Sequence, residues 1–163
     1  MHVQVGGFDP RDRLLDPVWA RLEETGTPVV IHCGSGPLAG RHTGPEPMTG
    51  LLERYPRLRL VIAHLGMPEY REFLDLAERF EGVHLDTTMF ATDFTEGLMP
   101  FDPADLPRLA ALRDKVLLGS DFPSIPYPYA HQLAALHRLG LGEEWLRAVL
   151  WDNGARLFGL EDA

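Results

Sequence analysis

Short apolar runs, rich in β-branched residues and leucine, recur along the chain. Four of them occupy residues 28–32, 59–64, 83–86 and 115–121, and a fifth, residues 2–5, opens the sequence. Runs of this length without regular polar alternation favour strands that are covered on both faces, which is typical of a parallel sheet. The pattern therefore predicts five parallel strands.

Between these runs, apolar residues recur at the spacing of an amphipathic helix. Pro17 opens the first such segment and Gly26 ends it, as expected of helix boundaries. The other segments with this spacing are residues 48–55, 70–80, 133–139 and 145–150. Strands that alternate with helices predict right-handed, parallel βα units in an α/β domain.

The number of units suggests a particular architecture. A closed (β/α)8 barrel has eight strands and typically ~250 residues, whereas this chain has 163 residues. We therefore expect a single domain, residues 1–163, that forms an incomplete TIM barrel of about five βα units and lacks about three N-terminal ones.

Three polar side chains follow the apolar runs, at the point where each predicted strand ends. They are His32, His64 and Asp121. Sites in parallel α/β proteins are built at this edge of the sheet. One such histidine is more often a structural group than a ligand, but three residues in register strengthen the functional interpretation. Imidazole and carboxylate are donors that zinc accepts, and a carboxylate beside a metal can also move a proton.

The composition limits the classes of partner. With 24 acidic and 15 basic side chains, the chain has a formal net charge of −9, which would repel a nucleic-acid backbone. Its one cysteine, Cys33, cannot form an internal disulfide, and we find neither a signal segment nor an apolar run of bilayer length. We therefore expect a cytoplasmic protein that acts on a small molecule and binds neither nucleic acid nor membrane.

Four sequence blocks carry a more specific signal. They are Val30-Ile-His-Cys-Gly34, Val61-Ile-Ala-His-Leu-Gly66, Leu118-Gly-Ser-Asp-Phe-Pro123 and Asn153-Gly-Ala-Arg-Leu-Phe-Gly159. In this order, and over nearly the whole chain, they resemble the blocks of the amidohydrolase-related family, which comprises metal-dependent hydrolases and decarboxylases with a TIM-barrel fold. The resemblance implies that the chain corresponds to strands four to eight of such a barrel.

The resemblance also implies roles for individual residues. His32 would be the metal ligand from strand five, and His64, from strand six, would orient or polarise the attacking water or the substrate. Asp121 would be the strand-eight carboxylate that contacts the metal and acts as general base. The implied cofactor is a divalent metal, with zinc as the first expectation, and the block at residues 153–159 would be the structural closing helix.

The chain departs from the family's pattern at its first metal motif. None of its seven histidines forms the His-x-His pair that the family places on strand one. A catalytic zinc site usually has three protein ligands, whereas His32 and Asp121 make two. We therefore expect an incomplete site that binds metal weakly in this chain alone. Open edges on the first and last strands would also favour homo-oligomers.

Further polar residues are candidates for substrate contacts. His2 and Gln4 lie on the first predicted strand, where an ordinary edge position explains them as well as a site does. Arg41 and His42 follow the His32 strand in a glycine-rich loop. Arg41 suits a bidentate pair with a substrate carboxylate, and a solvated loop arginine is the equal alternative.

Two residues beside the predicted strands have structural interpretations. Asp86, at the end of its run, either hydrogen-bonds a ligand histidine or, more simply, caps the following segment. Cys33 follows His32 directly, and neighbours along a strand point to opposite faces, so its thiol should be buried, unreactive and directed away from the site.

Several functions remain compatible with these observations. The first is hydrolysis of an amide, ester or lactone-like bond, in which metal-bound water loses its proton to Asp121 and His64 stabilises the oxyanion. Non-oxidative decarboxylation of an aromatic or related acid is an alternative on the same scaffold. A second class is a catalytically inactive fragment or a partner-dependent subunit. A nucleotide-binding domain is a third, although Gly34, Gly36 and Gly40 lack the spacing of a dinucleotide fingerprint.

Overall fold

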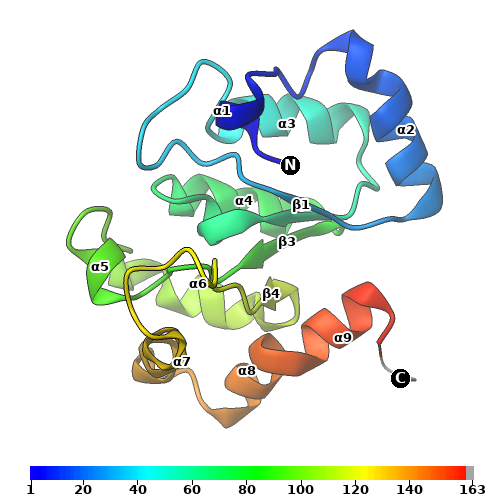
Figure 1. Ribbon diagram of the computed structural model, residues 1–163. Helices are drawn as coiled ribbons and strands as arrows, with labels where there is room; N and C mark the ends of the chain where they lie inside the picture. The colour runs from blue at the N-terminus through cyan, green and yellow to red at the C-terminus, as the bar shows by residue number, and fades with distance from the viewer. Residues whose placement is uncertain (161–163) are drawn as a thin grey trace.

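A four-stranded parallel sheet organises the computed structural model, which describes residues 1–160 (Figure 1). Its strands are β1 (Val29–Ile31), β2 (Leu60–Ile62), β3 (Val83–Asp86) and β4 (Val116–Leu117). They lie side by side in chain order, and each neighbouring pair is parallel. Sequential parallel strands joined by helices form the βα repeat that the sequence predicts, so the α/β prediction is confirmed.

Helices connect the strands and close the chain. They are α1 (Val3–Gly6), α2 (Asp16–Thr25), α3 (Pro45–Arg54), α4 (Tyr70–Arg79), α5 (Asp93–Glu96), α6 (Leu106–Ala111), α7 (Tyr129–Arg138), α8 (Glu143–Arg147) and α9 (Asn153–Phe158). Short 3-10 turns occupy Arg13–Leu15, Ala63–Gly66, Pro103–Asp105 and Arg113–Lys115. Within residues 1–160, no helix combines the length and the apolar character that crossing a membrane requires.

The predicted helices agree with the structure to within a few residues, with one exception. Helix α2 carries Pro17 in its first turn and ends at Gly26, whose φ of 62° only glycine adopts readily. The apolar spacing over residues 145–150 predicts one helix, but α8 gives way there to a π-helical turn, Ala148–Asp152, before α9 begins.

The two faces of the sheet differ in how they are covered. Figure 1 shows α2, α3 and α4 along one side, where Val29 and Ile31 of β1 are buried in the main core. Val30, which lies between them and points to the other side, is 46% exposed. On that other side, Leu157 of α9 forms a small separate cluster of buried residues with Val61 and Leu117. The expectation of two covered faces therefore holds for β2 but is wrong for β1.

The first predicted strand, residues 2–5, is also wrong. His2 alone forms a parallel bridge with His32, and the chain then turns into the single helical turn of α1. The Val5 N–H donates to Nδ1 of His2, and Gly7, with a φ of 61°, ends the turn. These local bonds compete with extension of the strand, because a side-chain cap and a glycine favour a helical turn.

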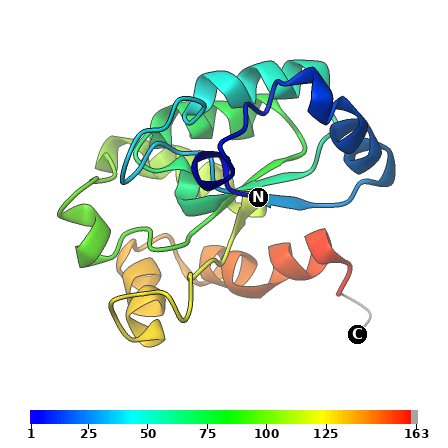
Figure 2. The ribbon, with the colours of Figure 1, turned by 45° about the horizontal axis from the view of Figure 1, so that its top comes forward.

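Both outer edges of the sheet carry hydrogen bonds from within the chain. The N-terminal segment lies beside β1 in Figure 2, where His32 donates its N–H to Met1 and the terminal amine donates to the Val30 carbonyl. At the other edge, the Leu118 N–H donates to the Val149 carbonyl of the π-helical turn. The edges that were expected to be open, and on which the homo-oligomer prediction depends, are thus partly occupied.

Candidate active site

The three residues that the sequence places at strand ends line one cavity. His32 directly follows β1, His64 lies two residues beyond β2, and Asp121 lies four residues beyond β4. With His2 they form the polar end of a cavity of about 510 Å³. The strand predicted over residues 115–121 is shorter than expected, since only Val116–Leu117 pairs with β3. Asp121 is therefore carried by a loop and not by a strand.

Three imidazoles and a carboxylate are in mutual contact in this cavity. The rings of His2 and His32 stack with centroids 4.1 Å apart, and His32 meets His64 edge-on at 4.9 Å. Nε2 of His64 lies 3.7 Å from Oδ2 of Asp121, and the Asp121 side chain is 45% exposed while that of His64 is 10% exposed. A buried base beside a more open carboxylate can exchange a proton with a molecule that enters the cavity.

Backbone strain is concentrated at the same residues. His64 has a φ of 57°, the next residue, Leu65, a φ of 51°, and Asp121 a φ of 55°. This left-handed region is unfavourable for residues that carry a Cβ, at about 1–2 kcal/mol each. Such conformations persist where surrounding bonds impose them, and they cluster at functional sites. The His64 N–H donates to Oδ1 of Asp86 at 3.0 Å, which is one such bond.

Burial sets the charge of His32. Desolvation, followed by the neighbouring imidazoles of His64 and His2, lowers the pKa of His32 to about 4, against an opposing effect of Asp121. Burial likewise lowers the pKa of His2. At neutral pH the His32 ring is therefore neutral and keeps one nitrogen lone pair, which is the form in which histidine binds metals.

The donor atoms fit a divalent cation only in part. His32 and Asp121 are of the right chemical types, and Nδ1 of His32 is buried with no hydrogen-bond partner among residues 1–160. However, the part of the chain that the structure describes contains no group of three histidine, cysteine, aspartate or glutamate side chains arranged to hold a metal. Two donors do not complete a metal site.

The remaining lining residues of the cavity are apolar, except for Thr95. Five of them are Met67, Met89, Met99, Phe94 and Leu98. Most of them come from the loop and short helix after β3, which the sequence pattern left unassigned. The cluster of methionine and phenylalanine over residues 89–99 was the signal, but apolar loop residues cannot be distinguished from core residues without the fold.

Two predicted substrate-binding residues do not line this cavity. Arg41 is exposed, and Nδ1 of His42 lies 3.4 Å from Oδ2 of Asp9. The loop after β1 folds back on itself, with the Gly40 N–H donating to the Thr43 hydroxyl and the Gly44 N–H to the Cys33 carbonyl. This turn directs the loop toward α3. Of the weaker candidates, only His2 lies at the cavity, while Gln4 is exposed and packs against the backbone of Gly40.

The expectations for Cys33 and Asp86 are met in the structure. Cys33 is fully buried in the main core, and burial raises the pKa of its thiol, so it is unreactive. Asp86 accepts the Thr88 N–H at 2.9 Å, which is a cap of the following segment. It contacts His64 as well, through the backbone N–H and not through the ring.

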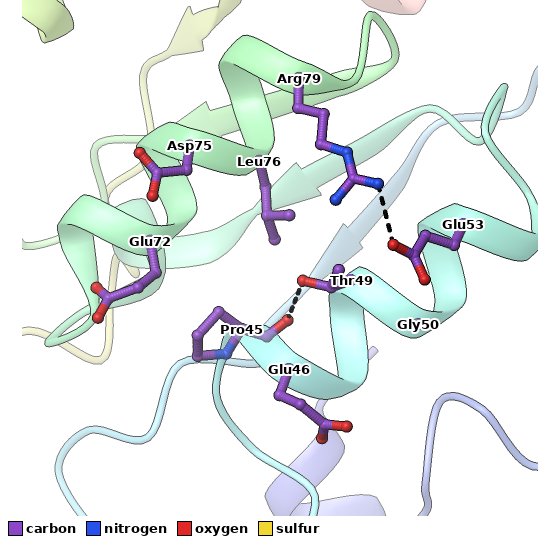
Figure 3. A pocket seen from close by; sticks show the side chains of 9 residues that line it. All are labelled: Pro45, Glu46, Thr49, Gly50, Glu53, Glu72, Asp75, Leu76 and Arg79. Carbon is purple, nitrogen blue, oxygen red and sulfur yellow. Dashed lines mark hydrogen bonds and ion pairs between the residues drawn. The ribbon is translucent and has the colours of Figure 1, made fainter.

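A second hollow, of about 480 Å³, lies between α3 and α4 on the outer surface (Figure 3). Acidic side chains dominate its lining, namely Glu46, Glu53, Glu72 and Asp75. Glu46, Glu53 and Asp75 form ion pairs with arginines, and Glu72 forms none within residues 1–160. These charges are thus compensated on the protein surface, and the hollow contains none of the imidazoles that distinguish the strand-end cavity.

Comparison with known proteins identifies the family to which this chain belongs. Residues 1–160 match the family model for amidohydrolases. The chain belongs to the amidohydrolase family. This membership confirms the resemblance drawn from the four sequence blocks. No curated protein sequence matches the chain significantly.

Solved structures of amidohydrolase-like proteins share the fold. An uncharacterised TIM-barrel protein from Bordetella bronchiseptica matches with a TM-score of 0.77 and 26% identity, covering 93% of this chain and 52% of that one. Dihydroorotase from Campylobacter jejuni matches with a TM-score of 0.68 and 21% identity, covering 96% and 54%. A manganese-bound dihydroxybenzoic acid decarboxylase from Polaromonas matches with a TM-score of 0.63 and 18% identity, covering 94% and 56%.

The chain therefore spans about half the length of these solved structures, and its sheet has the fold of part of a TIM barrel. The matched proteins include a hydrolase and a decarboxylase. Membership of the family and the fold are common to both activities, so the choice between them depends on the chemistry of the cavity.

Proposed function

We propose that this chain carries part of the active site of a metal-dependent hydrolase that cleaves an amide, ester or lactone-like bond. The observation that supports this best is the placement of His64 and Asp121, 3.7 Å apart, at the polar end of the cavity. Because the chain spans about half of its structural relatives, the proposal concerns the site that these residues help to form.

In the proposed reaction, Asp121 accepts a proton from the attacking water as the water oxygen bonds to the substrate carbonyl carbon. Its partly exposed carboxylate is accessible to both water and substrate. His64 hydrogen-bonds the carbonyl oxygen, where negative charge develops. The proton held by Asp121 then passes to the leaving nitrogen or oxygen as the carbon–heteroatom bond breaks.

His32 and Asp121 would hold a divalent cation, and at least one further donor would be needed to complete the site. When bound, it would supply acidity to water and charge stabilisation to the carbonyl oxygen. His32 suits this role because its imidazole is neutral at neutral pH. Zinc and manganese are both compatible with an imidazole and a carboxylate ligand. His2 stacks on His32 and would orient the ring or contact the substrate.

Non-oxidative decarboxylation is the second candidate, and the apolar cavity wall supports it. The thioethers of Met67, Met89 and Met99 and the ring of Phe94 suit a flat aromatic body. In this reaction the carbon–carboxylate bond breaks, and a proton from a site acid replaces the carboxylate on the ring. A decarboxylase among the structural relatives is consistent with this candidate.

Turnover in ¹⁸O-labelled water separates the two reactions. The protein, supplied with Zn²⁺ or Mn²⁺, is incubated with panels of aryl esters, anilides, lactones and aromatic carboxylic acids, and the products are analysed by mass spectrometry. Hydrolysis incorporates one ¹⁸O atom into the product acid, whereas decarboxylation releases carbon dioxide without such incorporation. Asp121→Asn should lower the rate by about 100-fold or more, while His137→Gln, on the exposed surface of α7, should leave it unchanged.

The same preparation tests whether the chain is an inactive fragment. Elemental analysis after dialysis measures how much divalent metal the purified chain retains. Both enzymatic proposals for this chain would be rejected if no panel gave a hydrolysis or decarboxylation product and the chain retained less than one metal ion per molecule. That result would favour an inactive fragment or a partner-dependent subunit.

A further inference from the structure

Strand β3 ends at Asp86, between the two strands that lead to His64 and Asp121. The Asp86 side chain is buried, with 7% exposure, and it does not line the cavity. Its Oδ1 atom accepts two backbone N–H groups, from His64 at 3.0 Å and from Thr88 at 2.9 Å. A charged acceptor in a buried position makes such bonds strong, so Asp86 fixes the backbone of the neighbouring strand end.

On its other side, the end of β3 fixes the segment that carries Asp121. A Cβ atom at Gly119 would lie 2.6 Å from Oδ1 of Asp86 and 2.1 Å from Oγ1 of Thr88, so only glycine permits this approach. The Gly119 N–H also donates to Oγ1 of Thr87 at 3.2 Å. Gly119 precedes Asp121 by two residues, and this contact therefore sets where the Asp121 loop begins.

The residues on both sides of Asp86 need such support. His64 and Asp121 have φ values of 57° and 55°, in the left-handed region that side chains disfavour. Without the bond from its N–H to Asp86, the His64 turn would lose a contact that offsets this cost. Relaxation of the turn would rotate the imidazole away from Asp121 and from the cavity.

We infer that Asp86 is the positioning residue of this site: it holds the His64 backbone through a hydrogen bond, and it packs with Thr88 against Gly119, where the Asp121 loop begins. It acts through these two residues and contacts no ligand itself. The inference rests on the proposed function, in which His64 and Asp121 act on one substrate. It goes beyond that function because it makes their coupling depend on a third, buried carboxylate.

Coupling between the two residues can be measured by NMR without turnover. The imidazole signals of His64, assigned with His64→Gln, are recorded with and without Asp121→Asn. The change in His64 chemical shift that Asp121→Asn causes is then compared in four backgrounds: wild type, Asp86→Asn, Asp86→Ala and Asp105→Asn. Asp105 is a matched control, since its carboxylate is also buried, at 6% exposure, but pairs with Arg71 on the outer layer.

The expected result is a clear shift change in the wild type and in Asp105→Asn, and its loss in Asp86→Ala. Asp86→Asn should retain part of it, because an amide oxygen can still accept both N–H groups. Where a substrate is found, Asp86→Ala should lower kcat by about 10- to 100-fold, with a smaller change in KM.

The inference would be overturned if Asp121→Asn changed the His64 chemical shifts by the same amount in the Asp86→Ala protein as in the wild type. Asp86 would then only cap the segment that follows β3. If Asp86→Ala does not fold, full wild-type coupling in Asp86→Asn would overturn the inference. Thr87→Val then tests the Asp121 side of the same strand end, because it removes the acceptor for the Gly119 N–H at nearly constant volume. Intact coupling in the wild type without hydrolysis or decarboxylation would reject the proposed function and not this inference.

Discussion

The two ends of the strands differ in how they adopt left-handed backbone. At the N-terminal ends, the turn before β1 uses Gly26, with a φ of 62°. At the C-terminal ends, the same region is occupied by Gly66 and also by five residues that carry side chains, namely His64, Leu65, Met89, Ala91 and Asp121. Glycine adopts this conformation at no steric cost, whereas the other residues do not. The turn before β1 therefore adopts this conformation without strain, whereas the C-terminal ends retain strain that places side chains at the cavity.

The largest effect that this comparison predicts is on stability, in the outer layer. Phe73 of α4 is fully buried, and its ring lies 2.0 Å from where a Cβ of Gly66 would be. Phe73→Ala should cost about 3–5 kcal/mol of unfolding free energy, measured by urea denaturation. Phe94→Ala, at a residue that is 47% exposed on the cavity wall, should cost about 0.5 kcal/mol. Equal losses would show that burial behind the strand ends does not separate the outer layer from the cavity wall.

A smaller loss is expected where β3 meets the Asp121 loop. Gly119→Ala forces a Cβ against Asp86 and Thr88, which should destabilise the fold by about 1–3 kcal/mol. Gly154→Ala is the control, because nothing lies within 4 Å of the added Cβ in helix α9. There the substitution should stabilise by about 0.5–1 kcal/mol. Thermal unfolding of both variants measures the sign, and a neutral Gly119→Ala would show that the close approach is not required.

The substitution of alanine by glycine should change stability in opposite directions at the cavity end of the strands and in a regular helix. Ala91 has a φ of 60° at the cavity end, so Ala91→Gly relieves strain and should stabilise by up to about 1 kcal/mol. Ala134 is exposed in the middle of α7, where Ala134→Gly should destabilise by about 1 kcal/mol. Chemical denaturation of the pair gives the difference. If Ala91→Gly also destabilises the protein, the strain at the cavity end is smaller than the backbone geometry implies.

The smallest effect concerns pH at the N-terminal end of β3. Burial lowers the pKa of His84 below its ordinary value of 6.5, and nearby Lys115, Arg59 and Arg156 contribute in the same direction. The unfolded state then binds a proton more readily than the folded one, so stability should fall as the pH decreases below about 6.5. Denaturation at pH 7.5 and 5.5 should show a shallower decrease in His84→Gln than in wild type. An identical decrease would assign the pH dependence to other groups.

The sequence pattern identified the elements whose surroundings are local. Helices α2, α3 and α4 followed from proline and glycine boundaries and from apolar spacing, because a helix satisfies its own backbone. The segment after His2 was mispredicted because the cap from His2 to Val5 and the turn at Gly7 outweigh two alternating valines. The end of β4 was placed too late, since the apolar run continues while the chain has already left the sheet.

The sequence predicted the polar residues of the candidate site, but not the loops and the apolar lining that surround them. His32, His64 and Asp121 stood out because polar side chains that end apolar runs of parallel strands converge at one edge. Arg41 and His42 lie outside the cavity, because the direction of a loop depends on its own hydrogen bonds, and their role in substrate binding stays a prediction. The apolar cavity lining that includes Met67, Met89 and Met99 was not predicted, since its residues cannot be distinguished by composition from core residues.

The sequence by itself determined the βα order, the amidohydrolase resemblance and the chemical types of donor at the strand ends. These features depend on local spacing and on residues that are close in the chain. Only the tertiary structure decided the left-handed turns at His64 and Asp121, the role of Asp86 between them and the exposure of Val30. These depend on contacts between residues more than 20 positions apart, such as the bond from His64 to Asp86. Side-chain packing and backbone strain arise only when strands meet.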